Sequence, residues 1–507
     1  MTTHARKAVL LTLTAAAVAS ALTAAGPAGA TGSGTGARGG TAPALDWRPC
    51  DQPNGPAGQE CADLSVPLDY SEPDGQRISL AVTRLRSDRP EARRGTLAVL
   101  PGGPGGSGVQ RLTQKGKALR EATKGQYDLV AFDPRGVGGS TTASCELAPE
   151  DRYFTTLRSW PGPDGDITAN LDRSRRTAES CHRNGGAVLR SFSTANEVRD
   201  LDLLRRALGE RKLSAWGSSY GAYVGAVYAQ KFPRHTDRVV LDSSGDPDPR
   251  RVARGWLANM GQAADDRFPD LAAWAADPER EAEGLRLAER PEDVRPLILA
   301  LAEKLDREPR TTTTPEVPLT GTVLRQALQS TLYSDAAFPQ FAALVKAAQD
   351  PARTPELPSA LARPMTDEEA AITMGVICND VRWPRLSDEE FRRAVAKDRT
   401  RHPLTAGLPV NVTPCAFWKD RPTEEPTRIT SEGPFNILMI QGRRDPATPH
   451  FGALEMRRAL GDRARMVTVE HGGHGLYLGD GNACGNEAVT TFLTTGRRPS
   501  EDVSCPD

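Results

Sequence analysis

The chain has 507 residues, of which 38% are hydrophobic and 25% are charged, a composition typical of folded globular proteins. Its 64 Lys and Arg residues balance 65 Asp and Glu residues, so the formal net charge is -1. This balance gives no electrostatic reason to expect a nucleic acid or an anionic membrane surface as a partner.

The first 30 residues are predicted to be a signal peptide. Arg6 and Lys7 precede an apolar run over Ala8–Ala25, and Ala28-Gly29-Ala30 supplies the small residues that a signal peptidase accepts. A transmembrane anchor is the alternative, but the run is short and rich in alanine. No later stretch has the roughly 20 apolar residues that a bilayer span requires. We therefore expect cleavage near Ala30 and a secreted, extracellular protein without a membrane anchor.

Residues 31–44 are small and polar, which predicts a flexible leader or pro-segment before a globular part that begins at residue 45. Within residues 45–246, four strand-length apolar runs each end in a Gly-rich or polar turn: Thr96–Leu100, Tyr127–Phe132, Leu213–Trp216 and Arg238–Leu241. A helix-like stretch, Glu197–Leu208, lies between two of them. Strands alternating with helices predict an α/β protein with a mostly parallel sheet, whose ligands bind at the carboxyl ends of the strands.

Residues 247–432 have a different composition, rich in Ala, Leu, Arg and Glu and broken by Pro. Two amphipathic helices are predicted at Trp256–Arg267 and Arg295–Lys304, the second with Pro296 in its first turn, where proline is tolerated. We expect this segment to be a helical lid inserted over the edge of the sheet. Strand patterns return at Asn436–Ile440 and Arg465–Val469, so residues 433–507 should complete the sheet domain.

The strongest local motif is Gly217-Ser218-Ser219-Tyr220-Gly221, which fits G-x-S-x-G between an apolar strand and a helix of small residues. Glycines on either side allow a sharp turn that holds the Ser219 hydroxyl clear of the sheet, at the positive end of a helix. A plain Gly/Ser turn is the alternative. The context predicts Ser219 as the nucleophile of an α/β-hydrolase fold, and Ser218 as a structural residue.

A serine nucleophile needs a histidine base. The polar surroundings of His182, His235 and His402 are typical of surface histidines. His474 lies in a Gly-rich loop after the last strand pattern, where this fold places its base. His471, in the same loop, is the alternative, and we interpret it as a loop histidine that packs or hydrogen-bonds nearby.

The base in turn needs an orienting carboxylate, which should follow a strand and precede the histidine. Asp445 follows an apolar strand, and Pro446 stiffens its turn. Asp242 is the rival, which we interpret as a turn residue at the start of the lid. The predicted chain order of the triad is therefore Ser219, Asp445, His474.

The Gly-rich segment Pro101–Gly108 follows the first apolar strand and predicts an oxyanion hole. Glycines let the backbone approach a substrate with free N–H groups, and we assign the amides of Gly103 and Tyr220 as donors. A plain Gly/Pro turn is the alternative. A phosphate-binding loop would require G-x₄-G-K-[ST], and this segment contains no lysine.

The eight cysteines all follow the predicted signal peptide, and an even number in an exported chain suggests disulfides. Pairing of successive cysteines is the simplest of about 105 possible connectivities. Their spacing lacks the close C-x₂₋₄-C clusters of zinc sites, so we expect no metal and no cofactor. The disulfide candidates are Cys50, Cys61, Cys145, Cys181, Cys378, Cys415, Cys484 and Cys505.

Together these motifs resemble those of the secreted tripeptidyl aminopeptidases of high-GC bacteria, within the proline iminopeptidase-like serine peptidases. The resemblance covers roughly residues 45–507 and rests on these segments: Pro101–Gly105, Asp133–Gly136, Gly217–Gly221, Gly442–Pro449, Gly473–Gly475, and the late Cys484 and Cys505. Pro101 stands where relatives often have His, which favours the tripeptidyl branch over proline specificity. The resemblance implies peptide substrates with a free N-terminus, cleaved under a helical lid.

A buried substrate ammonium would need a carboxylate partner. Asp380, beside Cys378, is the candidate from the lid, with Glu368 and Glu369 as weaker ones and a plain turn or cap as the alternative for Asp380. Two other functions compete with an exopeptidase. An esterase or lipase would use the same triad under an apolar lid, whereas this lid is heavily charged. A binding protein with an inactive hydrolase fold would lack a triad residue, and none is missing.

Overall fold

The computed structural model describes residues 45–52, 55–152, 154–155, 157–251, 254–479 and 482–506. The predicted signal peptide and leader, residues 1–44, lie outside the described residues, so export stays a prediction. Within the described ranges, no helix is long and apolar enough to cross a membrane.

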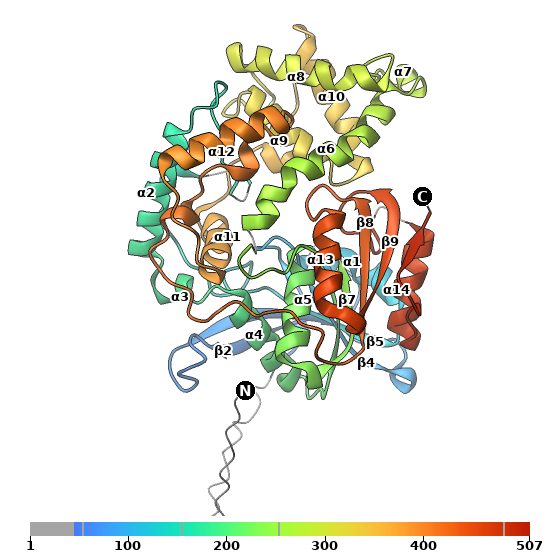
Figure 1. The fold of residues 1–507 in the computed structure, drawn as a ribbon. Helices are drawn as coiled ribbons and strands as arrows, with labels where there is room; N and C mark the ends of the chain where they lie inside the picture. Colours follow the sequence, from blue (N-terminus) through green and yellow to red (C-terminus); the bar gives the residue numbers. More distant parts are fainter. Residues whose placement is uncertain are drawn as a thin grey trace, which may run out of the picture. The chain divides into compact units, whose positions relative to one another are not determined.

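A ten-stranded sheet forms the centre of the molecule, in the order β1-β2-β3-β5-β4-β6-β7-β8-β9-β10 (Figure 1). All neighbours from β5 to β10 are parallel, whereas β1, β2 and β3 pair antiparallel at one edge. The mostly parallel α/β fold is therefore confirmed. The strands are β1 (Arg48–Pro49), β2 (Gln59–Pro67), β3 (Arg77–Leu85), β4 (Gly95–Leu100), β5 (Tyr127–Phe132), β6 (Leu213–Ser218), β7 (Thr236–Asp242), β8 (Ile437–Arg444), β9 (Ala464–Gly472) and β10 (Val503–Cys505).

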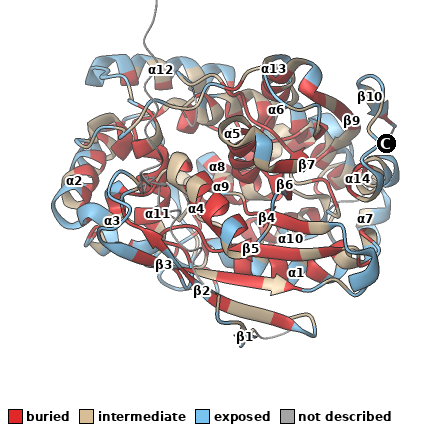
Figure 2. Cartoon of the chain, turned by 90° about the horizontal axis from the view of Figure 1, so that it is seen from below, coloured by how far each residue is buried: buried red, intermediate tan, exposed pale blue. Residues whose placement is uncertain are grey.

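Alternate residues of the central strands enter two different apolar clusters, one on each face of the sheet. In β8, for example, Leu438 and Ile440 pack in one cluster, and Ile437 and Met439 in the other. Figure 2 shows these central strands largely buried. Helices α1 (Gly108–Ala122) and α14 (Ala483–Thr495) cover the first face, and α4 (Thr194–Ala207), α5 (Tyr220–Lys231) and α13 (His450–Leu460) cover the second.

The chain between β7 and β8 is helical, and several of its helices share an apolar cluster of their own. The helices of this segment are α6 (Arg254–Ala276), α7 (Glu279–Ala282), α8 (Pro291–Arg307), α9 (Gly321–Thr331), α10 (Phe338–Gln349), α11 (Asp367–Asp380) and α12 (Asp388–Arg401). The shared cluster, which we call the α6–α10 cluster, takes its helical residues from α6, α8, α9 and α10. Both helices predicted in this segment are present. The placement of Pro296 in a first turn is wrong, because α8 begins at Pro291, which takes that position. The limits of the segment as a lid, 247 and 432, stay a prediction.

Helix α11 differs from its neighbours because it belongs to the apolar cluster of the sheet domain rather than to that of α6–α10. Buried residues lie on every side of it, including Ile372, Met374 and Cys378. It also contacts α3 (Gly186–Arg190), which follows α2 (Thr168–Asn184) in a second helical stretch between β5 and α4. Helices from two separate parts of the chain therefore meet at this side of the sheet.

Four disulfides join successive cysteines, as predicted: Cys50–Cys61, Cys145–Cys181, Cys378–Cys415 and Cys484–Cys505. No free cysteine remains in the part of the chain that the structure describes. Each disulfide closes a local loop, the longest with a sequence separation of 37.

Candidate active site

Ser219 lies in the sharp turn between β6 and α5, at the carboxyl end of a central strand. Its φ of 62° falls in the left-handed region, which a side chain adopts only under strain. The flanking glycines are needed: a Cβ on Gly217 would lie 2.0 Å from the Gly221 carbonyl oxygen, and a Cβ on Gly221 would lie 2.3 Å from that of Leu100. The two glycines thus permit the close-packed turn that carries Ser219.

His474 and Asp445 meet next to this turn. The His474 Nδ1 lies 2.9 Å and 3.0 Å from the two Asp445 carboxylate oxygens, and both side chains are buried. Asp445 follows β8 directly and also accepts the N–H groups of Ala447 and Thr448 at 2.8 Å each. The sequence order Ser219, Asp445, His474 therefore corresponds to three residues gathered at one edge of the sheet.

The pKa of His474 lies above its usual value of 6.5. Burial on its own would lower that pKa, but the charge of Asp445 and the hydrogen bond to it outweigh burial. With Nδ1 donating to Asp445, Nε2 is the nitrogen left to accept a proton. Among the described residues no hydrogen bond joins the Ser219 hydroxyl to His474, and catalytic hydrogen bonds commonly tighten only when substrate binds.

Asp242 holds the loop that carries His474, a role that the sequence interpretation missed. Our placement of Asp242 in a turn at the start of the lid is wrong, because it ends β7 and is completely buried. Its carboxylate accepts the N–H groups of Leu476 and Tyr477 at 2.9 Å and 3.0 Å. The next residue, Ser243, accepts the N–H of Gly475 at 2.9 Å. These bonds fix the backbone directly after the histidine.

The Gly-rich loop after β4 lies against Ser219. A Cβ on Gly102 would lie 3.0 Å from the Ser219 Cβ, so a side chain at this position would press against the serine. Gly103 has a φ of 120°, again a glycine conformation, and its N–H donates to no group of the described residues. Tyr220 is the first residue of α5, where a backbone N–H has no intrahelical partner. Tyr220 thus directly follows the serine and Gly103 follows the glycine that approaches it, and their role as oxyanion donors stays a prediction.

The comparisons with known proteins agree with this geometry. The profile of the alpha/beta hydrolase fold matches residues 95–283, and that of the TAP-like proteins matches residues 405–505. The tripeptidyl aminopeptidase of Streptomyces lividans is 34% identical over 91% of this chain and 86% of its own length. The chain belongs to the tripeptidyl aminopeptidase family. It is a serine hydrolase of the aminopeptidase class on an α/β-hydrolase fold.

Two further relatives show the range of names within this family. The serine protease Hip1 of Mycobacterium tuberculosis is 28% identical over 91% of this chain and 91% of its own length. Carboxylesterase B of the same species is 28% identical over 88% of this chain and 86% of its own length.

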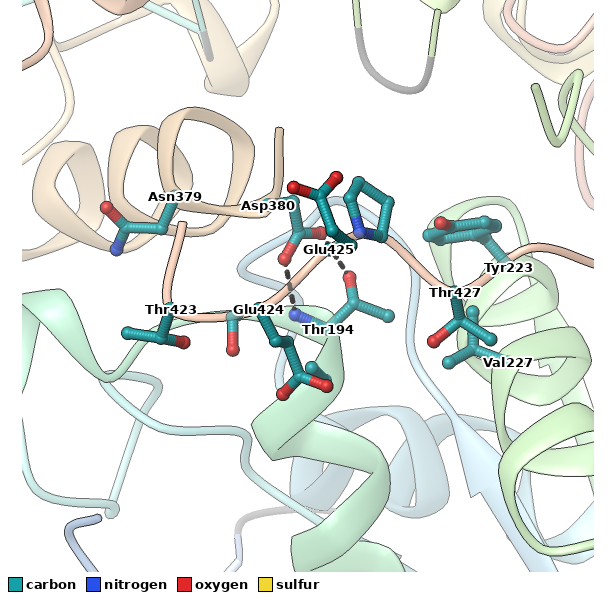
Figure 3. A pocket seen from close by; sticks show the side chains of 12 residues that line it. Thr194, Tyr223, Val227, Asn379, Asp380, Thr423, Glu424, Glu425 and Thr427 are labelled. Carbon is teal, nitrogen blue, oxygen red and sulfur yellow. Dashed lines mark hydrogen bonds between the residues drawn. The ribbon is translucent and has the colours of Figure 1, made fainter. Parts of the chain in front are cut away.

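Asp380 of this serine peptidase lies at the end of α11 and lines a small pocket with a volume of about 20 Å³ (Figure 3). Its carboxylate accepts the backbone N–H of Thr194 at 2.8 Å and also the Thr194 hydroxyl. Burial raises the pKa of Asp380 to about 6, although the bonds from Thr194 lower it. The weaker candidates differ: Glu369 closes a capping box with Thr366, and Glu368 is in the first turn of the same helix.

A buried glutamate behind the nucleophile escaped the sequence analysis. Glu197 is 4% exposed and accepts a hydrogen bond from the Tyr220 hydroxyl at 2.9 Å, and that hydroxyl lies 2.8 Å from the Thr194 hydroxyl. Burial raises the pKa of Glu197 to about 8, with Tyr220 opposing the shift. Asp380, Thr194, Tyr220 and Glu197 thus form one chain of polar contacts. Because each hydroxyl has a single hydrogen to donate, all three contacts are hydrogen bonds only when one of the two carboxyl groups is protonated. In sequence, Glu197 is only a charged residue of a helix, so no pattern marks it.

Two of the other histidines do not lie where the sequence analysis expected them, on the surface for His402 and in the loop after the last strand for His471. His402 is buried rather than on the surface, because its ring nitrogen lies 2.6 Å from the Asp265 carboxylate of α6. His471 lies in β9, half-buried and 3.6 Å from the Asp335 carboxylate. Only His474 pairs with Asp445.

Proposed function

We propose that the protein is a secreted serine exopeptidase that releases short peptides, in particular tripeptides, from free N-termini. The observation that carries the proposal is the His474–Asp445 pair at 2.9 Å beside a strained serine in a G-x-S-x-G turn. In this mechanism, Ser219 attacks the scissile carbonyl and His474 takes its proton. Asp445 holds the tautomer of His474 and stabilises its positive charge.

The leaving amine then receives its proton from His474, and water hydrolyses the acyl-enzyme with His474 again as base. The amides of Gly103 and Tyr220 would stabilise the oxyanion of both tetrahedral intermediates, a contribution worth roughly 3–4 kcal/mol per donor. No cofactor is required for these steps.

The placement of Asp380 supports tripeptides as the released unit. Thr373 of α11 donates to the carbonyl of Pro104, in the Gly-rich loop after β4, at 3.4 Å, and Asp380 follows seven residues later in the same helix. That separation is about 10 Å along the helix axis. An extended tripeptide also spans about 10 Å. We therefore propose that Asp380 receives the substrate ammonium while the third peptide bond lies at Ser219.

A peptide series tests this function directly. Chromogenic substrates with one, two or three residues before the leaving group, each with a free or a blocked N-terminus, are compared by kcat/KM. We expect the free three-residue substrate to exceed all the others. Equal rates on free and blocked peptides, or preference for a simple ester, would favour the esterase alternative that the carboxylesterase relative raises.

The variant Asp380→Asn tests the amine-binding role. We expect KM for the free tripeptidyl substrate to rise about tenfold or more, because a buried charge loses its partner. Reaction with a small ester that has no amine should change little. Equal loss on both substrates would assign Asp380 to the support of Thr194 and Tyr220 instead.

A further inference from the structure

One residue of the helical segment reaches the candidate base. Tyr333 follows α9, and its carbonyl oxygen accepts the backbone N–H of His474 at 2.9 Å. Its ring also packs against the His474 imidazole, with ring centroids 5.1 Å apart and planes at 72°. The histidine is therefore held on three sides: by Asp445 at Nδ1, by Tyr333 at its ring and main chain, and by Asp242 through the loop that follows.

A buried arginine fixes the position of Tyr333. The Arg267 side chain of α6 is only 1% exposed and donates to the carbonyl of Leu332 at 3.1 Å. Its guanidinium also forms ion pairs with Asp270 and Asp335, so residues on both sides of Tyr333 are anchored. A completely buried arginine with this many partners is costly to displace.

The same arginine joins the helical segment to the end of the sheet. A Cβ on Gly472, two residues before His474, would lie 1.9 Å from an Arg267 guanidinium nitrogen, so a side chain there would displace the guanidinium. Arg444, at the end of β8, bonds to Asp270 at 2.8 Å. The loops of Asp445 and His474 and the segment of Tyr333 thus meet around Arg267.

We propose that Tyr333 is a positioning residue for His474, so that the base is aligned only when the helical segment is docked on the sheet. This inference rests on the proposed function, in which His474 is the base. Tyr333 touches no reacting atom in this proposal. It restricts the rotation of the imidazole, and a misplacement of about 1 Å in a catalytic group can lower the rate about a hundredfold.

The test compares Tyr333→Ala and Tyr333→Phe with Phe391→Ala. Phe391 lies in α12 of the same helical segment, in a separate apolar cluster, so its loss removes an aromatic ring without touching His474. We expect Tyr333→Ala to lower kcat on the tripeptidyl substrate about ten- to a hundredfold, with KM within about twofold of wild type. Tyr333→Phe keeps the ring and the carbonyl, so it should stay within about threefold in kcat. Phe391→Ala should leave kcat unchanged even if it lowers Tm.

Two readouts separate positioning from general stability. The low-field proton NMR signal of the His474 Nδ1 hydrogen should shift or broaden in Tyr333→Ala and stay in place in Phe391→Ala. The acid limb of kcat/KM against pH should also move in Tyr333→Ala and stay in place in Phe391→Ala. Neither variant alters the other charged groups that face His474, which are Asp445, Asp242 and Arg111.

Three results would overturn the inference: an unchanged NMR signal and pH limb in Tyr333→Ala, an effect on KM alone, or an equal loss of kcat in Phe391→Ala. Failure of the proposed function has a different signature. Wild-type activity in His474→Ala would show that His474 is not the base, whatever the effect of the Tyr333 variants.

Discussion

At the scale of single residues, the site depends on a few positions where the backbone is strained or closely packed. Ser219 and Ser243 both have left-handed φ values, 62° and 60°, and they stand on neighbouring strand ends. Such conformations cost on the order of 1–3 kcal/mol each and persist only where the surroundings enforce them. Here the enforcing contacts are the glycines of the turn and the bonds around Asp242. The strain keeps one hydroxyl, that of Ser219, presented to the candidate base.

Replacement of Ser219 by Ala should abolish turnover and leave the fold intact, because the hydroxyl forms the acyl bond and contributes little packing. Ser218→Ala is the matched control, since it removes the neighbouring hydroxyl. We expect kcat/KM to fall by more than about a thousandfold in the first variant only, and Ser219→Ala with His474→Ala to lose little more than either alone. Circular dichroism checks the fold. Residual activity above that level in Ser219→Ala would place the nucleophile elsewhere.

The pH dependence of activity should follow His474. The base must be neutral, and its pKa lies above 6.5, so activity should fall as the pH drops through that raised pKa. Asp445→Asn removes the charge that raises it, and burial then lowers the pKa, so the acid limb of the remaining activity should move to lower pH. The rate itself should fall about ten-thousandfold, as in a comparable triad. An acid limb that stays at the same pH in Asp445→Asn would show that the ionisation of His474 does not control the rate.

At the scale of elements, three helices meet behind the nucleophile through buried polar groups. Glu197 of α4, Tyr220 of α5 and Asp380 of α11 are linked through Thr194. Burial raises the pKa of Glu197 to about 8 and that of Asp380 to about 6, so near neutral pH Glu197 is protonated whereas Asp380 carries its charge. The packing of these helices is therefore sensitive to alkaline pH rather than to acid.

The variant Glu197→Gln tests this sensitivity. In the wild type, the stability linked to Glu197 is fully present below its unfolded pKa of about 4.5 and is lost as the pH rises towards about 8. Glutamine does not titrate, so the free energy of unfolding of the variant should rise relative to wild type by a few kcal/mol between pH 5 and pH 8, at about 1.4 kcal/mol per pKa unit. Urea unfolding at the two pH values measures it. A difference that stays constant with pH would show that Glu197 is ionised in the fold.

Some elements could be predicted from the sequence and others could not. The central strands were predictable because β4 to β9 are buried on both faces and appear as continuous apolar runs. Strands β2 and β3 alternate buried and exposed residues and lack that signal. The site residues of the G-x-S-x-G turn and the Asp and His loops follow from local sequence. Tyr333 and Glu197 do not, because each reaches the site only through packing between distant segments.

At the scale of the whole molecule, every disulfide lies within one part of the fold. Cys378–Cys415 joins two points of the helical segment, and Cys145–Cys181 fastens α2 to the chain before it. None of the four links the α6–α10 cluster to the sheet, so hydrogen bonds, ion pairs and apolar packing, including those of Arg267, hold these two parts together in the described chain.

Complete pairing has a direct chemical test. The unreduced mature protein should contain no thiol that iodoacetamide can alkylate, as measured by mass spectrometry. The double variant Cys378→Ala/Cys415→Ala should lower the free energy of unfolding by roughly 2–4 kcal/mol, since the bridge restricts the unfolded chain. A stoichiometric free thiol in the folded protein would contradict the full set of four bridges.

The order of the disulfides along the chain also bears on how the molecule is made. Each cysteine is bonded to the next one in sequence, and no bridge encloses another. A polypeptide that emerges into an oxidising compartment with its amino end first would therefore meet its correct partner cysteine before any wrong one. Oxidation in simple order of arrival yields the native set, so the biosynthesis of this enzyme should depend on a thiol oxidase and little on a disulfide isomerase.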